Sequence, residues 1–338
     1  MKTNRRNFLK IAGISSTGMI SSCMISPDAG NHSQKSGPFF NTKKISEQAH
    51  KQHFNMCGYA APKLDTVRIG VVGIGSRGLG SLKRLLLIEG VEIKAVCDKY
   101  QERVDLAQKS LSEAGLAKAK EYAGNEEIWK DLVNRDDLDL IYICTPRGIH
   151  TNIAVLAMET EKHAATEVPA LSTLEEAWQL VETSEKTRKH CMMLENCCYD
   201  FFELLVLNMV RQGLFGDIIH ADGGYIHYQV ENNFKKRPSP DMWRLRESQH
   251  RDANLYPTHG LGPICQVMNI NRGDKMEFLT STSSNDFQMG NKAAELAKKD
   301  AFYKEFDTHS YRGNMNTTVI KTEKGRTIML QYDITSPG

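Results

Sequence analysis

A glycine-rich hexapeptide in the sequence has the spacing of a phosphate-binding turn. Gly73, Gly75 and Gly78 form a GxGxxG pattern that follows a β-branched apolar run at 67–72 and opens a segment of helical periodicity. The first glycine permits a tight bend, the second lets the backbone approach a pyrophosphate, and the third allows close packing of helix on strand. The helix N-terminus adds amide donors and partial positive charge. The segment therefore predicts a bound dinucleotide.

An acidic residue lies where a dinucleotide site needs one. Asp98 ends a second apolar run at 91–97, 20 residues after Gly78, the spacing at which a carboxylate accepts the ribose hydroxyls. This favours NAD, because a 2′-phosphate would lie against the carboxylate. Arg77 and Lys99 are close in sequence and leave NADP as an alternative.

Apolar runs alternate with amphipathic segments from residue 64 onward, which is typical of βαβ units and a parallel sheet. We predict a helix over 174–188 that opens with a capping box of Ser172 and Glu175. The other elements predicted in this region are a helix at 100–114 and strands at 138–144, 162–166 and 190–194. The fold class is thus α/β, with a doubly wound Rossmann domain over 64–195.

The remaining segment, 196–338, begins with a predicted helix at 202–211 and then consists mainly of predicted strands. These strands lie at 217–228, 276–281, 317–321 and 326–333, and a hairpin turn is expected at 322–325. Met192, Met193 and the apolar run 204–209 are expected in the core. We interpret this region as a substrate-binding α/β domain.

The composition excludes several classes of protein. With 338 residues, 40% hydrophobic and 25% charged, the chain is neither disordered nor a coiled coil. A net charge of +2 with no basic stripe argues against a nucleic-acid partner. Eight cysteines are too few for a disulfide scaffold, and neither a CxxC pair nor a His/Cys cluster is visible, so no metal site is predicted.

The N-terminus has the pattern of an export signal. Two arginines at positions 5 and 6 precede a short, weakly apolar run at 11–22, as in twin-arginine signals. The run ends in Ile20-Ser21-Ser22-Cys23, which resembles a lipoprotein cleavage box. We expect a signal at 1–23, a polar linker at 24–63, and a bacterial protein that is periplasmic or anchored to the membrane through an acylated Cys23.

Longer motifs extend these observations over most of the chain. From about residue 67 to the end it carries, in order, GIGSRG, CTPRGIH, ATEVPA, ENCCY, WRLR, NLYPTHGLGPICQ and NINRGD. This series resembles glycoside hydrolase family 109, a group of NAD-dependent α-N-acetylgalactosaminidases within the glucose-fructose oxidoreductase and inositol dehydrogenase superfamily. The resemblance implies a Rossmann domain followed by an open-faced α/β domain, with a terminal amino sugar over the nicotinamide. It also implies pairing into a homodimer through the exposed sheet.

The resemblance also implies the site residues. Cofactor contacts are expected, besides the glycines, from Ser76, Arg77, Asp98, Arg147, His150, Glu167, Val168 and Asn196. Substrate contacts are expected from Tyr225, Arg244, Tyr256, Pro257, Thr258 and His259. Glu195 is expected in the site without an assigned role.

The chain departs from the family pattern in two ways. Arg147 stands where the family usually has tryptophan, and a further tyrosine expected after an SPxP segment falls beyond Gly338, so the substrate domain is expected to be incomplete. Sugar dehydrogenases of the superfamily carry Glu-Lys-Pro, whereas Val168 replaces the lysine here. Another base is needed, and Tyr256 with His259, three residues apart in a predicted turn, are the candidates.

The family chemistry is a closed redox cycle. The sugar is oxidised at C3, the C2 proton is removed, the C1 aglycone is expelled, water adds, and the hydride is returned, which gives net retention. Such a cycle suits an exported enzyme, because free nicotinamide cofactor is scarce outside the cytoplasm. The alternatives are an NAD-dependent sugar dehydrogenase or epimerase, and a non-catalytic sugar-binding lipoprotein that holds NAD.

Overall fold

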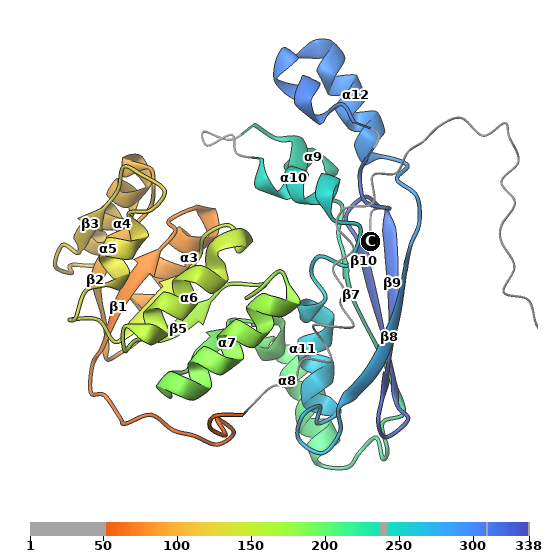
Figure 1. Ribbon diagram of the computed structural model, residues 1–338, viewed down its shortest axis with the longest axis horizontal. Coiled ribbons are helices and arrows are strands. Elements are labelled where there is room, and N and C mark those ends of the chain that lie inside the picture. The colour runs from red at the N-terminus through yellow and green to blue at the C-terminus, as the bar shows by residue number, and fades with distance from the viewer. Residues whose placement is uncertain (1–51, 237–241, 309, 337–338) are drawn as a thin grey trace, which may run out of the picture. The chain divides into compact units, whose positions relative to one another are not determined.

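Strand β1 (Val67–Val72) lies in the middle of a six-stranded parallel sheet (Figure 1). The computed structural model describes residues 52–236, 242–308 and 310–336. The predicted export signal, Cys23 and the linker up to residue 51 lie outside the described residues. Within the described part, no helix combines the length and apolar character needed to cross a bilayer.

The parallel sheet has the strand order β3-β2-β1-β4-β5-β6, in which the chain reverses its direction of travel between β1 and β4. Every neighbouring pair is parallel. After β1 the elements are α3 (Ser76–Leu85), β2 (Val91–Cys97), α4 (Gln101–Glu113), β3 (Lys120–Tyr122), α5 (Trp129–Val133), β4 (Leu140–Ile143), the 3-10 turn η1 (Arg147–Ile149), α6 (His150–Glu159), β5 (His163–Thr166), α7 (Leu174–Thr187) and β6 (Cys191–Met193). The predicted doubly wound sheet is confirmed.

Two apolar clusters cover the two faces of this sheet, as the period of two along each strand requires. Ile69 and Val71 of β1 belong to the cluster under α3 and α4, whereas Val72 joins the cluster under α5 and α6. Burial of both faces explains why these strands consist almost entirely of apolar residues.

The predicted capping box is displaced by one residue. Helix α7 begins at Leu174, and Thr173 rather than Ser172 accepts the hydrogen bond from the Glu176 amide. The Glu176 carboxylate in turn accepts from the Thr173 amide. Both Ser172/Glu175 and Thr173/Glu176 have the required spacing, and the position of the first helical turn decides between them.

The second sheet has the order β7-β10-β9-β8 and mixed direction. β10 (Thr327–Asp333) pairs in parallel with β7 (His220–Ile226) and antiparallel with β9 (Met315–Thr322), which pairs with β8 (Met276–Ser283). One face packs against α11 (Thr258–Val267), and residues of β8 on the sheet remain largely exposed. The predicted open-faced α/β domain and its hairpin turn are confirmed.

Four helices of this region were not predicted as such. They are α9 (Val230–Phe234), α10 (Trp243–His250), α11 and α12 (Met289–Lys299). The predicted turn that holds Tyr256 and His259 is in fact the N-terminus of α11, which starts directly after Pro257. Gly260, Gly262 and Pro263 lie within that helix and hide its helical pattern, because both residue types have low helix propensity.

The predicted core position of the apolar residues near 192 and 204 is wrong for most of them. Met192, Leu204, Leu205 and Val206 are exposed, and in α8 (Phe201–Arg211) only Leu207 is buried. Their burial would need a further surface over α8, which the described residues do not supply. Apolar character alone did not identify the buried face of this helix.

Candidate active site

Backbone contact within the glycine turn fixes the start of α3. A Cβ at Gly78 would lie 1.9 Å from the carbonyl oxygen of Gly73, and Gly73 itself has φ +92°. A Cβ at Gly75, by contrast, would meet no protein atom within 4 Å. The first and third glycines thus serve the turn, and the second leaves space beside it.

Asp98 lies at the carboxyl end of β2, beside the turn. It is buried and accepts hydrogen bonds from the amides of Ile74 at 2.8 Å and Tyr100 at 3.1 Å. Arg103, which the sequence did not indicate, approaches the same carboxylate at 3.4 Å. The long contacts of Arg103 use the lone pairs that the amides leave, so a ribose hydroxyl would be accepted in place of Arg103.

Arg77 points away from Asp98 and links the ends of two other strands. Its Nε donates to Glu167 after β5 at 2.8 Å, and its Nη2 lies 3.4 Å from Oδ1 of Asn196 after β6. The hydrogen bond with Glu167 raises the pKa of Arg77. The other cation near the ribose position, Lys99, pairs with Glu126. Both cations that left NADP as an alternative are thus paired with carboxylates, whereas Arg103 is the cation that lies at Asp98 itself.

His150 is part of the scaffold. Its ring is buried and both nitrogens lie within hydrogen-bond distance of backbone carbonyls, those of Pro169 at 2.8 Å and Thr145 at 2.7 Å. Burial lowers its pKa, which favours the neutral ring. The ring therefore joins the loop after β4 to the segment after β5, where Val168 packs against Tyr256 and Tyr225.

On the other side of the site, two glycines bring α11 directly onto β7. A Cβ at Gly260 would lie 2.8 Å from the backbone carbon of Gly223. Two residues further along α11, a Cβ at Gly262 would lie 2.9 Å from both Cys198 Sγ and Glu195 Cγ. These close approaches place three distant chain segments, near 195, 225 and 259, at one point.

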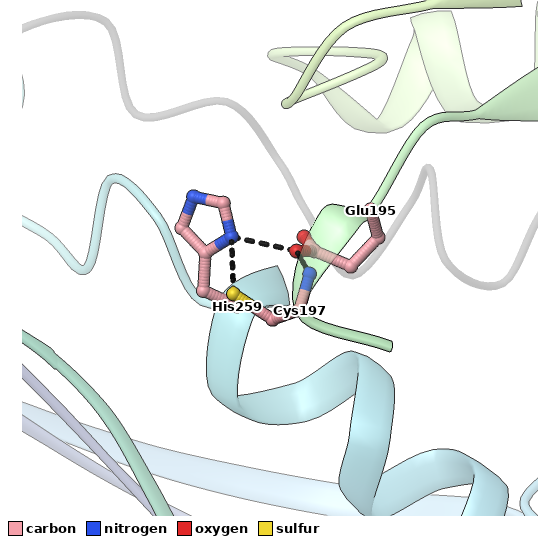
Figure 2. A group of neighbouring side chains, drawn as sticks. All are labelled: Glu195, Cys197 and His259. Carbon is pink, nitrogen blue, oxygen red and sulfur yellow. Dashed lines mark hydrogen bonds and ion pairs between the residues drawn. The ribbon is translucent and has the colours of Figure 1, made fainter. Parts of the chain in front are cut away.

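Glu195 and His259 form a hydrogen-bonded pair at that point (Figure 2). His259 Nδ1 lies 2.6 Å from Glu195 Oε1, which also accepts from the Cys197 amide at 3.1 Å. Burial alone would raise the pKa of Glu195, but the hydrogen bond from His259 and that from the Cys197 amide leave it below its ordinary value. Glu195 is thus a carboxylate, and it selects the tautomer of His259 that carries its proton on Nδ1.

His259 also belongs to a layer of aromatic rings. The ring centroid of Tyr225 lies 5.4 Å from that of His259 and 5.1 Å from that of Tyr256, and all three rings are nearly parallel. Arg244 Nη1 donates to the Tyr256 hydroxyl at 2.5 Å. Burial raises the pKa of Tyr225, against the opposing charge of Arg244. The layer holds these side chains in fixed orientations.

A cavity of about 780 Å³ joins the glycine turn to this aromatic layer. Its lining includes Gly75 and Asp98 from the parallel sheet and Tyr225, Tyr256 and His259 from the second sheet and α11. A cavity of this size is within the range that holds a small-molecule ligand together with a cofactor ring. The geometry brings a dinucleotide turn and a polar, aromatic-lined pocket into one space.

Comparison with known proteins identifies this arrangement. A family model described as glycosyl hydrolase 109, C-terminal domain, matches residues 199–338, and one described as oxidoreductase family, NAD-binding Rossmann fold, matches residues 67–195. A glycosyl hydrolase family 109 protein of Shewanella pealeana is 43% identical over 342 aligned positions, covering 100% of this chain and 70% of the relative. The chain belongs to glycosyl hydrolase family 109. It is an NAD-dependent glycoside hydrolase, as the sequence predicted.

Other relatives agree with this assignment. A protein of Bacteroides fragilis named alpha-N-acetylgalactosaminidase is 47% identical over 299 residues, covering 87% of this chain and 68% of the relative. Among solved structures, an NAD binding oxidoreductase of Klebsiella pneumoniae superposes with a TM-score of 0.62 at 15% identity, covering 81% of this chain and 68% of that one. A scyllo-inositol dehydrogenase of Lactobacillus casei with bound NAD(H) and scyllo-inositol gives 0.58 at 16%, covering 79% and 69%. At this identity the structures support the fold.

The side of the cavity that the parallel sheet forms has a geometry that fits NAD. The Gly75 position is open, α3 begins without a side-chain cap that would occupy its amides, and Asp98 lies at the ribose position. The residues that would hold the cofactor are therefore the turn, Asp98 and the loops after β4, β5 and β6.

Most of the predicted site residues line the cavity. Those that do are Gly73, Gly75, Ser76, Arg77, Asp98, Arg147, His150, Glu167, Val168, Asn196, Tyr225, Arg244, Tyr256 and His259. Gly78, Glu195, Pro257 and Thr258 do not line it. Gly78 packs in the turn, Glu195 lies behind His259, and Pro257 and Thr258 form the start of α11. These four residues affect the cavity through the lining residues that they contact.

Arg147, at the position usual for tryptophan, faces the second sheet rather than the turn. Its guanidinium is buried, donates to the Leu255 carbonyl at 3.3 Å, and lies 4.8 Å from the ring centroid of Tyr256. It also lies 5.6 Å from the ring of Trp243, and Glu247 is 4.0 Å away. The arginine thus replaces an aromatic ring by a cation stacked on two aromatic rings.

Sequence reasoning missed Tyr332, Trp243 and Glu247, which also line the cavity. Tyr332 is buried, stacks 5.7 Å from Tyr225, and holds Arg312 over its ring at 4.2 Å. Alternation of Ile328, Leu330 and Tyr332 in the predicted strand at 326–333 could have placed Tyr332 on the inner face. Trp243 begins the WRLR motif, which could have placed it near Arg244, whereas nothing in the sequence pattern marks Glu247.

Proposed function

We propose that this enzyme hydrolyses terminal α-N-acetylgalactosamine residues, with net retention, by a redox-neutral cycle. The observation that carries the proposal is the position of His259, held by Glu195 on an aromatic layer, in the same cavity as the dinucleotide turn. When bound, NAD supplies a reversible two-electron oxidation of the sugar at C3 and ends the cycle in its starting state.

Of the two proton-transfer groups, one is set to accept a proton and the other to donate one. His259 carries its proton on Nδ1, and Nε2, which points away from Glu195 and Cys197 (Figure 2), has a free lone pair that accepts a proton. Tyr256 accepts the hydrogen bond from Arg244, because a guanidinium only donates, so its own hydroxyl proton is free to be donated. His259 and Tyr256 together serve the transfers at the C3 hydroxyl and at C2.

The remaining residues orient the sugar and stabilise charge. Arg244, stacked 4.5 Å from the ring of Trp243, keeps a cation beside the Tyr256 oxygen and the cavity. Val168 supplies an apolar contact where a dehydrogenase of the superfamily has its lysine, which leaves the proton transfers to the α11 side. Paired carboxylates of the usual glycosidase type are not needed for this reaction.

The test is hydrolysis of p-nitrophenyl α-N-acetylgalactosaminide by the purified chain. Release of nitrophenol without net accumulation of NADH, together with an isotope effect for substrate deuterated at C3, is the expected result. NADH that grows in proportion to product would instead support a sugar dehydrogenase or epimerase. Tight sugar binding with no exchange of the C2 proton in heavy water would support the non-catalytic lipoprotein.

We propose in addition that the protein is exported by the twin-arginine route and anchored through Cys23. A reaction that returns its cofactor to the starting state needs no cytoplasmic supply of NAD, which supports this location. Fractionation of cells that express the full chain tests it. The protein is expected in the membrane fraction of the envelope, and Cys23→Ala is expected to release it; wild-type protein in the cytosol would contradict the proposal.

We propose that the outer face of the second sheet joins two copies of the chain. Ile226, Phe278 and Val319 are exposed apolar residues on the face of this sheet that points away from α11, and such residues gathered on one face are typical of an interface. Light scattering of the purified chain is expected to give the mass of a dimer, and Phe278→Lys is expected to give a monomer. A monomeric wild-type chain would exclude this interface.

A further inference from the structure

Three metal-ligating side chains converge behind the cavity, although 64 residues separate the first from the last (Figure 2). Glu195 and Cys197 lie at the start of the 3-10 turn η2 (Asn196–Tyr199), and His259 lies in the first turn of α11. Their ligand atoms, Glu195 Oε1, Cys197 Sγ and His259 Nδ1, all lie within 4.8 Å of one another.

The distances suit a small tetrahedral metal ion. With metal–sulfur and metal–nitrogen bonds of about 2.3 and 2.0 Å, the ligand atoms of a zinc site lie roughly 3.5 Å apart. Cys197 Sγ is already 3.4 Å from His259 Nδ1. The Glu195–His259 hydrogen bond at 2.6 Å would open by about 1 Å as the ion replaces the Nδ1 proton.

The surroundings favour a cation at this point. Glu195 is buried with only 6% of its side chain exposed, and its second oxygen, Oε2, is buried without a hydrogen-bond partner. A divalent ion would compensate the carboxylate and displace the thiol proton to solvent.

We propose that Glu195, Cys197 and His259 form a binding site for a zinc-like divalent cation, with a carboxylate, a thiolate and an imidazole as ligands. The fourth position would be taken by water, as in zinc sites with three protein ligands. The ion replaces the proton of His259 Nδ1 and takes the carboxylate that orients the ring. Its presence therefore inhibits the hydrolase, a consequence that rests on the proposed function, whereas the binding does not.

Cobalt spectroscopy tests the binding without any activity. Addition of Co²⁺ to the full chain is expected to give one equivalent of bound ion with a thiolate-to-cobalt charge-transfer band in the near ultraviolet. The band is expected to disappear in Cys197→Ser and to remain in Cys198→Ser, a matched control whose sulfur packs against Gly262 outside the cluster. Absence of the band in the wild-type chain, or its persistence in Cys197→Ser, would overturn the proposal.

Zinc affinity gives a second measurement by competition with a chromophoric chelator. Cys197→Ser and His259→Ala are each expected to weaken binding at least about tenfold, the lower limit for loss even of an outer partner of a metal ligand. Equal zinc affinity in the wild type and in both variants, with folding verified by thermal melting, would exclude the site.

Inhibition separates this inference from the proposed function. Micromolar zinc is expected to abolish nitrophenol release by the wild type and Cys198→Ser, and to inhibit Cys197→Ser at least about tenfold more weakly. A chain that binds the cobalt ion but shows no glycosidase activity would contradict the proposed function and support the metal site. Glycosidase activity in a chain that gives no cobalt band would support the proposed function and contradict the metal site.

Discussion

The wall of the cavity that the parallel sheet forms, which we call the cofactor wall, holds its polar groups in ion pairs and backbone hydrogen bonds. The opposite wall, which we call the aromatic wall, holds its polar groups on stacked aromatic rings. Asp98 is fixed by two amides and Glu167 by Arg77. Tyr225, Tyr256 and His259 stack on one another, and Glu195 and Arg147 tie this layer to loops at the end of the parallel sheet. The first wall suits a charged cofactor of constant shape, and the second suits the apolar face and hydroxyls of a sugar.

The two walls also differ in how their chain segments meet. The turn at Gly73 and the strand end at Asp98 belong to consecutive βα units, and the loops after β4, β5 and β6 of the same parallel sheet complete the cofactor wall. The aromatic wall needs β7, α11 and η2: Gly260 meets the backbone of β7, and Gly262 meets the side chains of Cys198 and Glu195. The comparison indicates that the cofactor wall tolerates change in the second domain, whereas the aromatic wall depends on both.

Loss of His259 is expected to have the largest effect. His259→Ala removes the proton acceptor of the aromatic wall and should reduce kcat by about 10²–10⁴-fold, the usual contribution of a general acid or base. The amount of NAD that copurifies with the chain should not change. His220→Asn, on the exposed part of β7, is the control. A loss below tenfold would remove His259 from the chemistry.

Substitutions at the glycines of the turn test the cofactor wall without changing the aromatic wall. Gly78→Ala places a Cβ against the Gly73 carbonyl and should destabilise the fold by about 3 kcal/mol or more, measured by urea unfolding. Gly75→Ala should keep the stability and lower the affinity for NAD on the order of tenfold, about 1.4 kcal/mol. Gly80→Ala in the same helix is the control. Equal behaviour of the variants at 75 and 78 would contradict the assigned roles.

Loss of Arg147 is expected to have a smaller effect, and on stability. This residue joins the two walls but is not one of the proton-transfer residues. Arg147→Ala leaves the Leu255 carbonyl without its donor and removes the cation over Tyr256. We expect a loss of about 1–3 kcal/mol in the free energy of unfolding, with unchanged NAD content. Arg211→Ala at the end of α8 is the control. An unchanged unfolding midpoint would show that this buried cation is compensated elsewhere.

The smallest effect is expected in the pH dependence of stability. The pKa of Glu195 is lower in the folded than in the unfolded chain, so the folded state binds fewer protons and the carboxylate stabilises it. This contribution is complete above the ordinary value of 4.5 and is lost as the pH falls through the lowered folded pKa. Urea midpoints of wild type and Glu195→Gln should therefore differ at neutral pH and converge in acid.

Glu277→Gln, on the exposed face of β8, should follow the wild type at every pH. A difference between wild type and Glu195→Gln that grows toward low pH would mean that the carboxylate is not stabilised by its partners. Such a result would weaken the tautomer assigned to His259, and with it the distinction between the two walls.

The sequence alone determined the cofactor wall and the fold of the first domain. The GxGxxG turn, Asp98 and the alternating strands are local patterns, because each depends on the residues of one or two consecutive elements. It also determined the identity of the residues near 195, 225 and 259, through the motifs shared with the family. It did not determine that α11 begins at Thr258, since glycines and a proline hide the helical pattern.

Only the tertiary structure decided how the aromatic wall works. Three sets of contacts join segments that are far apart in the chain. Glu195 and the thiol of Cys197 lie beside His259, and Tyr225 stacks with both His259 and Tyr332. Their proximity comes from close packing at Gly223, Gly260 and Gly262, a property that no periodicity records. The same reason hid the metal-ligating cluster, because its ligands come from two elements that meet only when α11 lies against η2.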